Sequence, residues 1–460
     1  MMRSLYSGVA GLKTHQTRMD VIGNNIANVN TTAYKSQSMT FSDLMYQTTQ
    51  SASGANASTG VGGVNARQIG LGAKTSAIKT AITGQGASQT TNDPFDIMIT
   101  GENFFVVSNG SENLFTRDGS FYVDGAGNLC MTSTGYNVMG WGTTTDGTKI
   151  KQDLVQPLRI MSAEYMTYPP EATSEAELSG ILDSKDTNVL SDAGKTVTFD
   201  FYDNLGFKYT AKCALNYVAK EGDDSNTGEF KLTVNEVTDS KGTVIGAKEN
   251  YEKMFDTEKN HFFFSLTDGS LVHIGDSRPA EGKGTLDFTL GTSNAVSGLG
   301  EAFTKNIHVD ASALVNFNNN GASTSTFTRG SKEGAGAGRM IGEMSGVSIQ
   351  KDGMIYATYD NGQSRLLGQI ATASFANASG LAKEGDNLYS ATQNSGDFDG
   401  IGVDITSGGG YMNTGVLEMS NVDLSAEFTE MITTQRGFQA NSRIITVSDT
   451  LLEELTNLKR

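Results

Sequence analysis

The last forty residues of the chain, 421–460, carry the pattern of one long α-helix. They contain no proline and a single glycine, Gly437. Asp423 is placed to cap the first turn, and apolar residues then recur at steps of three and four, which is the spacing of one helix face. These apolar residues are Leu424, Phe428, Met431, Ile444, Val447, Leu451, Leu455 and Leu458. An apolar stripe of this length predicts a helix that packs against a partner.

The middle of this predicted helix, residues 433–442, is polar. Gln435, Gln439 and Asn441 interrupt the apolar stripe there. Polar residues in the contact face of paired helices set the register of the pair at a cost in stability. The polar stretch therefore weakens a simple two-helix coil.

The first thirty residues offer a partner for this helix. Their apolar residues follow the same spacing, with Gln16 taking one position of the stripe: Leu5, Val9, Leu12, Met19, Ile22, Ile26 and Val29. Two amphipathic helices at the two ends of one chain predict a coiled coil between the termini, with the rest of the chain inserted. The alternative is two ordinary surface helices at the ends of a globular protein.

Between the ends, the sequence is typical of antiparallel β structure. Short alternating apolar runs are separated by Asn-Gly and Asp-Gly pairs, such as Asn109-Gly110 and Asp118-Gly119, which are strong hairpin signals. The same texture returns after a stretch rich in Gly, Ser and Asn at 318–338. We therefore predict a multidomain, mainly β protein with terminal α-helices in a coiled coil and nested antiparallel β domains between them.

Four parts follow from this pattern. Residues 31–72 begin with AYKSQSMTFSDLMYQ and continue into a small, polar, Gly-rich stretch, as irregular connectors do. The predicted parts are the terminal helices at 1–30 plus 413–460, the connector at 31–72, a first β domain at 73–146 plus 331–412, and an inserted outer β domain at 147–330.

Charge and hydropathy exclude several classes of partner. The 460 residues carry a formal net charge of −17 and no basic patch interleaved with aromatic residues, which argues against nucleic-acid binding. No apolar run reaches the length of a membrane span, so we expect no membrane insertion. The N-terminus has no continuous apolar region and is therefore not a secretory signal peptide; if the protein leaves the cell, its route needs no cleaved signal of that type.

The sequence offers no catalytic, cofactor-binding or metal-binding site. His15, His261, His273 and His308 lack metal-ligand spacing, and Gly194-Lys195-Thr196 lacks the upstream glycine of a phosphate-binding loop. There is no GxSxG nucleophile motif. Two cysteines far apart do not form a disulfide framework, so Cys130 and Cys213 are predicted to be buried free thiols. We expect a protein that is not an enzyme and has no cofactor.

Both ends of the chain carry a specific resemblance. The segments DVIGNNIANVNTTAYK (20–35) and LEMSNVDLSAEFTEMITTQRGFQANSRIITVSDTLLEELTNL (417–458) resemble the terminal signatures of the axial proteins of the bacterial flagellum. GENFFVV (101–107), FTRDGSF (115–121) and TGYNVMGW (134–141) resemble the β domain of the rod and hook branch of that family. The length of the chain and its insert at 147–330 are most similar to the hook members.

The resemblance implies a function and a location. Hook subunits assemble into a curved tubular polymer that acts as a universal joint and passes torque from rod to filament. The implied partners are further copies of the chain, the distal rod protein, the hook cap protein, the hook–filament junction protein and the flagellar type III export apparatus. The implied location is the flagellar hook and basal body, outside the cell after export.

The resemblance also implies which residues pack between subunits. On the first helix they are Leu5, Val9, Leu12, Met19, Ile22, Asn25, Ile26, Asn28 and Val29. On the last helix they are Leu424, Phe428, Met431, Gln435, Phe438, Asn441, Ile445, Leu452 and Leu455. The connector at 31–72 is expected to bridge neighbouring subunits.

Two alternatives stay open at this point. One is a distal rod protein with an extra domain. The other is an axial protein whose insert is an adhesive or carbohydrate-binding module, or an enzyme carried on the polymer. The insert itself matches no motif.

Overall fold

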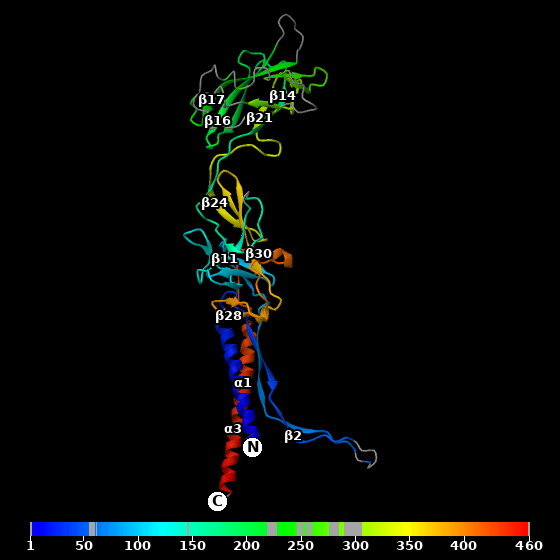
Figure 1. Cartoon of the computed structure of the whole chain (residues 1–460), viewed down its shortest axis with the longest axis vertical. Coiled ribbons are helices and arrows are strands. Elements are labelled where there is room, and N and C mark those ends of the chain that lie inside the picture. Colours follow the sequence, from blue (N-terminus) through cyan, green and yellow to red (C-terminus); the bar gives the residue numbers. More distant parts are fainter. Residues whose placement is uncertain are drawn as a thin grey trace. The chain divides into compact units, whose positions relative to one another are not determined.

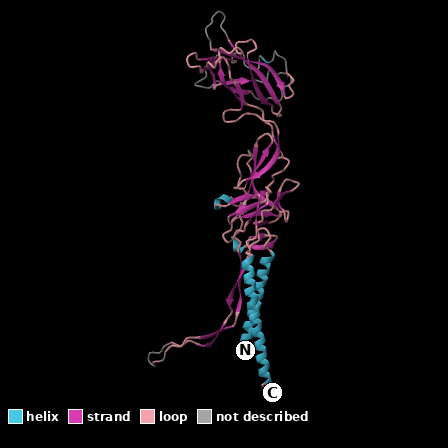
Figure 2. Cartoon of the chain, turned by 180° about the vertical axis from the view of Figure 1, so that it is seen from behind, coloured by secondary structure: helices cyan, strands magenta, loops and turns pink. Residues whose placement is uncertain are grey.

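The computed structural model describes residues 2–54, 60, 62–144, 147–218, 228–245, 251, 254, 260–275, 285–288 and 306–458. It divides into two compact units. Unit 1 comprises residues 1–165, 346–357 and 364–460, and unit 2 comprises residues 166–345 and 358–363. The two long helices lie at the two ends of the chain, and the described parts between them are mostly strands and loops with short helical segments (Figure 2).

Two long helices in unit 1 lie side by side (Figure 1). The first, α1, spans Met2–Ala27, and the last, α3, spans Leu424–Asn457. The Oδ1 atom of Asp423 accepts hydrogen bonds from the backbone N–H groups of Ser425 at 2.9 Å and Ala426 at 3.2 Å, which caps α3. The predictions of two terminal helices, their pairing and the cap residue are confirmed.

Four strands follow α1 and form two successive hairpins. Strand β1 (Gln37–Asp43) pairs with β4 (Ala73–Thr80), and both contact α1. Beyond them, β2 (Tyr46–Gln50) pairs with β3 (Arg67–Gly70), and every residue of these two strands is exposed. We call β2, β3 and the described residues between them, 51–54, 60 and 62–66, the arm; its strands lead away from the helices (Figure 1). Where the sequence predicts an irregular connector, the structure has paired strands.

The rest of unit 1 is the β body, built on one large sheet with the strand order β26-β11-β7-β8-β29-β28. These strands are β7 (Phe104–Ser108), β8 (Asn113–Thr116), β11 (Asn137–Gly142), β26 (Ser364–Ile370), β28 (Ala382–Gly385) and β29 (Leu388–Ser390). Phe104, Phe115 and Phe375 pack edge to face in its core, with ring centroids 4.7 to 6.0 Å apart.

Smaller elements complete the β body. Two short pairs, β5 with β31 and β6 with β30, join the sheet region to the residues before α3. The strands are β5 (Ser88–Thr90), β6 (Ile97–Thr100), β9 (Phe121–Val123), β10 (Leu129–Met131), β12 (Gln156–Pro157), β27 (Thr372–Ala373), β30 (Tyr411–Thr414) and β31 (Val416–Glu418), with the 3₁₀ turns η1 (Ala378–Gly380) and η2 (Ile405–Gly408). The boundary between the units passes through β24 (Gly342–Ile349) and β25 (Met354–Tyr359).

Unit 2 contains two five-stranded sheets around one apolar core. One sheet is an antiparallel meander of β15 (Lys195–Tyr202), β16 (Lys208–Tyr217), β17 (Glu229–Asp239), β18 (His261–Phe264) and β19 (Leu271–Ile274). The other contains β14 (Glu175–Leu182), β20 (Thr285–Phe288), β21 (Ile307–Asp310), β22 (Leu314–Asn316) and β23 (Thr326–Arg329). A short strand, β13 (Thr167–Tyr168), pairs with β24.

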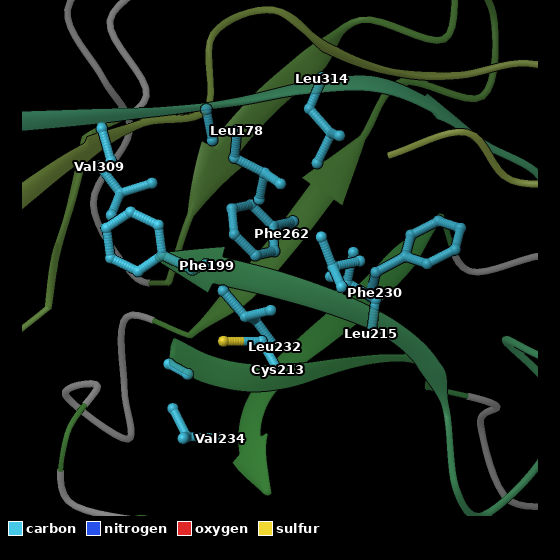
Figure 3. Packing of buried hydrophobic residues seen from close by; sticks show 14 of the residues in the cluster. Leu178, Phe199, Cys213, Leu215, Phe230, Leu232, Val234, Phe262, Val309 and Leu314 are labelled. Carbon is cyan, nitrogen blue, oxygen red and sulfur yellow. The ribbon is translucent and has the colours of Figure 1, made fainter. Parts of the chain in front are cut away.

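Both sheets of unit 2 supply the core. Phe199, Phe230 and Phe262 from the meander meet Leu178 and Leu314 from the other sheet (Figure 3). The alternation of buried and exposed residues along β15 and β17 is the pattern expected of strands with one face on a core. The prediction of antiparallel pairing is wrong for β14, which pairs in parallel with β21 and β22 because residues 307–316 return to it in the same direction.

We expect Phe262→Ala to lower the free energy of unfolding of unit 2 by about 3–5 kcal/mol, because a fully buried phenylalanine is replaced by a cavity. Val272→Ala on the neighbouring strand is the control, since Val272 is 44% exposed, and its effect should stay below about 1 kcal/mol. Denaturant unfolding of the full-length monomer measures both values. Equal losses for the two variants would contradict the assignment of this core.

Candidate functional site: the helix pair and its junction

Helices α1 and α3 run antiparallel, as three contacts along their length show. Ser4 and Ser448 place their hydroxyl oxygens 3.5 Å apart near one end of the pair. Near the other end, Asn25 Nδ2 donates to Glu427 Oε1 at 2.8 Å. Between them, Arg18 forms an ion pair with Glu430 at 2.9 Å.

The contact face of α3, which we call the seam, follows a heptad spacing in which polar and apolar residues alternate. Its members are Glu427, Met431, Thr434, Phe438, Asn441, Ile445, Ser448 and Leu452, and with Gly437 they are the residues of α3 that are not exposed. Every second seam position is therefore a polar group. Such a seam buries less apolar surface than a leucine-rich one and favours a single register over high stability.

Two glycines of α1 lie against the seam. A Cβ atom at Gly8 would lie 3.3 Å from Ile445 Cγ1, and one at Gly11 would lie within 3 Å of the Asn441 side chain. On α3, Gly437 leaves space for the ring of His15, because a Cβ atom at Gly437 would lie 2.7 Å from His15 Cε1. Glycines at these positions let the two backbones approach closely.

His15 and Arg18 connect the helix pair to β1 through Phe41. The His15 and Phe41 rings meet edge to face with centroids 5.6 Å apart, and the Arg18 guanidinium lies 5.4 Å from the centroid of the same ring. Burial and the nearby charge of Arg18 lower the pKa of His15. A neutral imidazole fits this position between a glycine and an aromatic ring.

Asn25 joins three segments at the point where the helix pair meets the β body. Its Oδ1 accepts from Gln37 N at 2.9 Å and from the Tyr34 hydroxyl at 3.3 Å, and its Nδ2 donates to Gln37 O at 2.7 Å and to Glu427. The side chain is buried. Burial raises the pKa of both Tyr34 and Glu427.

A second buried group lies at the same junction. Lys35, Arg117 and Glu418, which we call the junction cluster, are each no more than 1% exposed. Lys35 Nζ donates to Glu418 Oε1 at 2.7 Å, and Arg117 Nη1 lies 3.9 Å from Glu418 Oε2. Burial lowers the pKa of Lys35 and of Arg117, and the charge of Glu418 opposes that shift. Sequence reasoning missed this cluster, because no local pattern relates the three residues.

The residues predicted to pack between subunits fall into three groups in the single chain. Ile22 and Asn25 are buried. Leu5, Leu12, Met19, Ile26, Asn28, Val29, Met431, Phe438, Asn441, Ile445 and Leu452 are half-buried. Val9, Leu424, Phe428, Gln435 and Leu455 are exposed.

A further apolar surface on α3 has no partner among the described residues of the chain. We call Ile444, Val447, Leu451, Leu455 and Leu458 the outer stripe; all five side chains are exposed, from 44% at Ile444 to 82% at Leu458. The Ser4–Ser448 contact sets the register so that the last turns of α3 extend beyond the start of α1. Five of the eight residues of the apolar stripe predicted from the sequence therefore form this outward surface, and Met431 is the one that belongs to the seam.

Two further observations concern chemistry. Cys130 and Cys213 are buried free thiols as predicted, and burial raises the pKa of Cys213 to about 12. Within the described residues, no three or more His, Cys, Asp or Glu side chains are grouped to hold a metal ion. Among the same residues, no helix is both long enough and apolar enough to cross a membrane.

The paired terminal helices and the β domains inserted between them agree with what the resemblance to flagellar axial proteins implies. Three family models match the chain: Flagella basal body rod protein at residues 5–35, Flagellar hook protein FlgE/F/G D1 domain at 98–174, and Flagellar basal body rod FlgEFG protein C-terminal at 413–458. The first and last matches fall on α1 and α3.

Relatives match over the full length. The flagellar hook protein FlgE of Treponema pallidum and that of Borreliella burgdorferi are each 34% identical to this chain, with 100% of both chains covered. The flagellar basal-body rod protein FlgG of Bacillus subtilis is 29% identical, again with 100% of both covered. A crystal structure of Helicobacter pylori flagellar hook protein FlgE2 gives a TM-score of 0.44 at 14% identity, covering 72% of this chain and 100% of that one. The chain belongs to the flagellar hook protein family.

Gly437→Ala is expected to weaken the helix pair, although alanine normally favours a helix over glycine by about 1 kcal/mol. The reason is the His15 ring, which occupies the space that the new methyl group needs. The control is Gly23→Ala in α1, where a Cβ meets nothing within 4 Å and the substitution should stabilise. Melting temperatures of isolated polymers measure the difference, and a rise for both variants would contradict the seam described above.

Proposed function

We propose that this chain is the structural subunit of the flagellar hook, and that copies of it assemble into a curved tubular polymer passing torque from rod to filament. The observation that carries the proposal is the sequence identity of 34% to each of two hook proteins, over the full length of both chains. The function assigned is mechanical, and the proposal includes no catalytic step and no cofactor.

The outer stripe is the surface we assign to contacts between copies. Its five apolar side chains are exposed in the single chain, and an apolar helix face of this length is stable in water only when another surface covers it. Exposed residues of the predicted packing set, such as Val9 and Phe428, add to this surface on the sides of the helix pair. In a helical polymer, one surface of each copy contacts a different surface of the next copy.

The arm is the second surface we assign to neighbouring copies. An isolated two-stranded hairpin is marginally stable in water, and all residues of β2 and β3 are exposed. Tyr46 and Ile69 lie on it as exposed large side chains that a neighbouring copy would cover. This role agrees with the bridging function expected of residues 31–72.

The remaining assignments follow from the hook role. The subunit leaves the cell through the flagellar type III export apparatus, and the finished polymer meets the distal rod protein, the hook cap protein and the hook–filament junction protein. We retain the four-part division, with the helices at 1–30 plus 413–460, the connector at 31–72, the first β domain at 73–146 plus 331–412, and the insert at 147–330.

A distal rod protein is the second candidate, because the chain is also 29% identical to a rod protein along its whole length. Electron microscopy of purified hook–basal bodies labelled with antibody to residues 166–345 separates the two. We expect label along the curved segment outside the cell envelope. Label confined to the straight rod would assign the chain to the rod, and basal bodies without label at either place would refute both assignments.

The double substitution Leu451→Ser and Leu455→Ser is expected to reduce hooks per cell at least tenfold. Each leucine buried at a contact contributes about 1.5–3 kcal/mol, and the loss is repeated in every subunit of the polymer. Leu190→Ser is the control, because Leu190 is 54% exposed in unit 2 and lies outside the outer stripe. Hooks are counted by electron microscopy in cells that export equal amounts of each variant. If cells with the double variant carry as many hooks as wild-type cells, the outer stripe does not form the proposed contacts.

A further inference from the structure

The junction cluster takes its three charged side chains from three separate parts of unit 1. Lys35 lies between α1 and β1, Arg117 directly follows β8, and Glu418 is the last residue of β31. Two of these parts lead directly into the paired helices, and the third belongs to the large sheet of the β body. The cluster therefore lies where the helix pair is attached to the β body.

Each charge is held by directional contacts. Glu418 Oε1 accepts from Lys35 Nζ and from Gly86 N at 2.8 Å, while Lys35 Nζ also donates to Gly84 O at 2.7 Å. Arg117 Nη2 donates to Gly101 O at 2.6 Å, and its guanidinium lies 5.0 Å from the centroid of the Phe104 ring. These contacts fix the loop at 84–86 against the last strand before α3.

One carboxylate faces two cations in this buried place. The second carboxylate oxygen of Glu418 and the Nη1 and Nε atoms of Arg117 have no hydrogen-bond partner, so the 3.9 Å approach between Glu418 and Arg117 is held by charge. Without Glu418, Lys35 and Arg117 would be two buried positive charges in one place, and only the weaker attraction of Glu102 on Arg117 would oppose them. The arrangement is thus stable only when all three segments are in place.

We propose that Lys35, Arg117 and Glu418 act as a clamp that holds the helix pair in one orientation on the β body, so that twist applied to the helices is passed to the β body. The torque-bearing part of this proposal rests on the hook function proposed above. A buried charge with fixed hydrogen-bond directions accepts one arrangement, whereas an apolar contact tolerates several packings.

Neighbouring backbone contacts support the clamp. Ala33 N donates to Glu418 O at 2.7 Å, and Asn421 receives a hydrogen bond from Ser36 N at 2.8 Å and donates to the carbonyls of Ala81 and Gly84. The segments before β1, before β5 and before α3 are therefore bound to one another. Loss of the charges should loosen all three together.

Glu418→Gln tests the clamp, because it keeps the shape of the side chain and removes the negative charge. Glu430→Gln is the matched control, because it also removes one negative charge. It breaks the ion pair between Glu430 and Arg18, but an exposed ion pair of this kind contributes little to stability. Amide hydrogen exchange of the full-length protein is the readout. We expect exchange at 33–36, 84–87 and 416–421 to accelerate at least tenfold in Glu418→Gln and less than twofold in the control.

A second variant keeps the test valid if Glu418→Gln fails to fold. Lys35→Met combined with Glu418→Gln removes one cation together with the carboxylate, and its exchange should be slower than that of Glu418→Gln alone. Equal exchange in Glu418→Gln and Glu430→Gln would overturn the clamp, as would a double variant no slower than the single one.

Torsional stiffness of single hooks then tests the transmission of twist. Hooks of Glu418→Gln should be at least twofold softer in twist than wild type, while Glu430→Gln hooks should match wild type. If Glu418→Gln hooks have the same torsional stiffness as wild-type hooks, the mechanical role of the clamp is overturned. Antibody label on the rod alone would overturn the proposed function and leave the exchange result standing.

Discussion

The antiparallel pairing of α1 with α3 fixes the topology of everything between them. Asn25, near the end of α1, bonds to Glu427 in the first turn of α3, so the chain leaves the helix pair and returns to it at the same place. All strands of the protein are therefore inserted into one helical hairpin. This closure requires a firm attachment at its root, and the structure supplies it with β31, Asn25 and the junction cluster rather than with a large apolar contact.

The helix pair divides its side chains between two tasks. The seam places glycine and serine of α1 against alternating polar and apolar residues of α3, which favours one register and contributes modest stability. The five apolar side chains of the outer stripe stay exposed beside that seam. A helix that keeps its strongest apolar surface for outside partners is more stable in an assembly than alone. This division accounts for a weak pairing within the chain beside an exposed apolar surface, which we assign to contacts with neighbouring copies.

The sequence was sufficient for the terminal helices, their pairing and many of the turns, and insufficient for the strands of the arm and for most side-chain contacts. Helix periodicity, the Asp423 cap and turns such as Asn109-Gly110 have local causes, and the structure contains each of them. The resemblance named five of the eight seam residues but assigned them to contacts between subunits, because neither periodicity nor a family signature distinguishes burial within the chain from burial by another copy. Lys35 and Glu418 lie 383 residues apart, and nothing local marks a charged residue as buried. The parallel pairing of β14 with β21 also depends on which distant strand returns beside it.

Stiffness and compliance have different physical origins in unit 1. The junction is held by buried charges and short hydrogen bonds, which resist rotation because their energy depends on direction. The arm has two strands with solvent on every side, so its conformation follows whatever surface covers it. If copies meet through the outer stripe and the arm, bending needs only changes between copies, whereas twist must pass through each subunit. Rigidity at the junction and adaptability at the contacts then allow one polymer to bend easily while carrying torque.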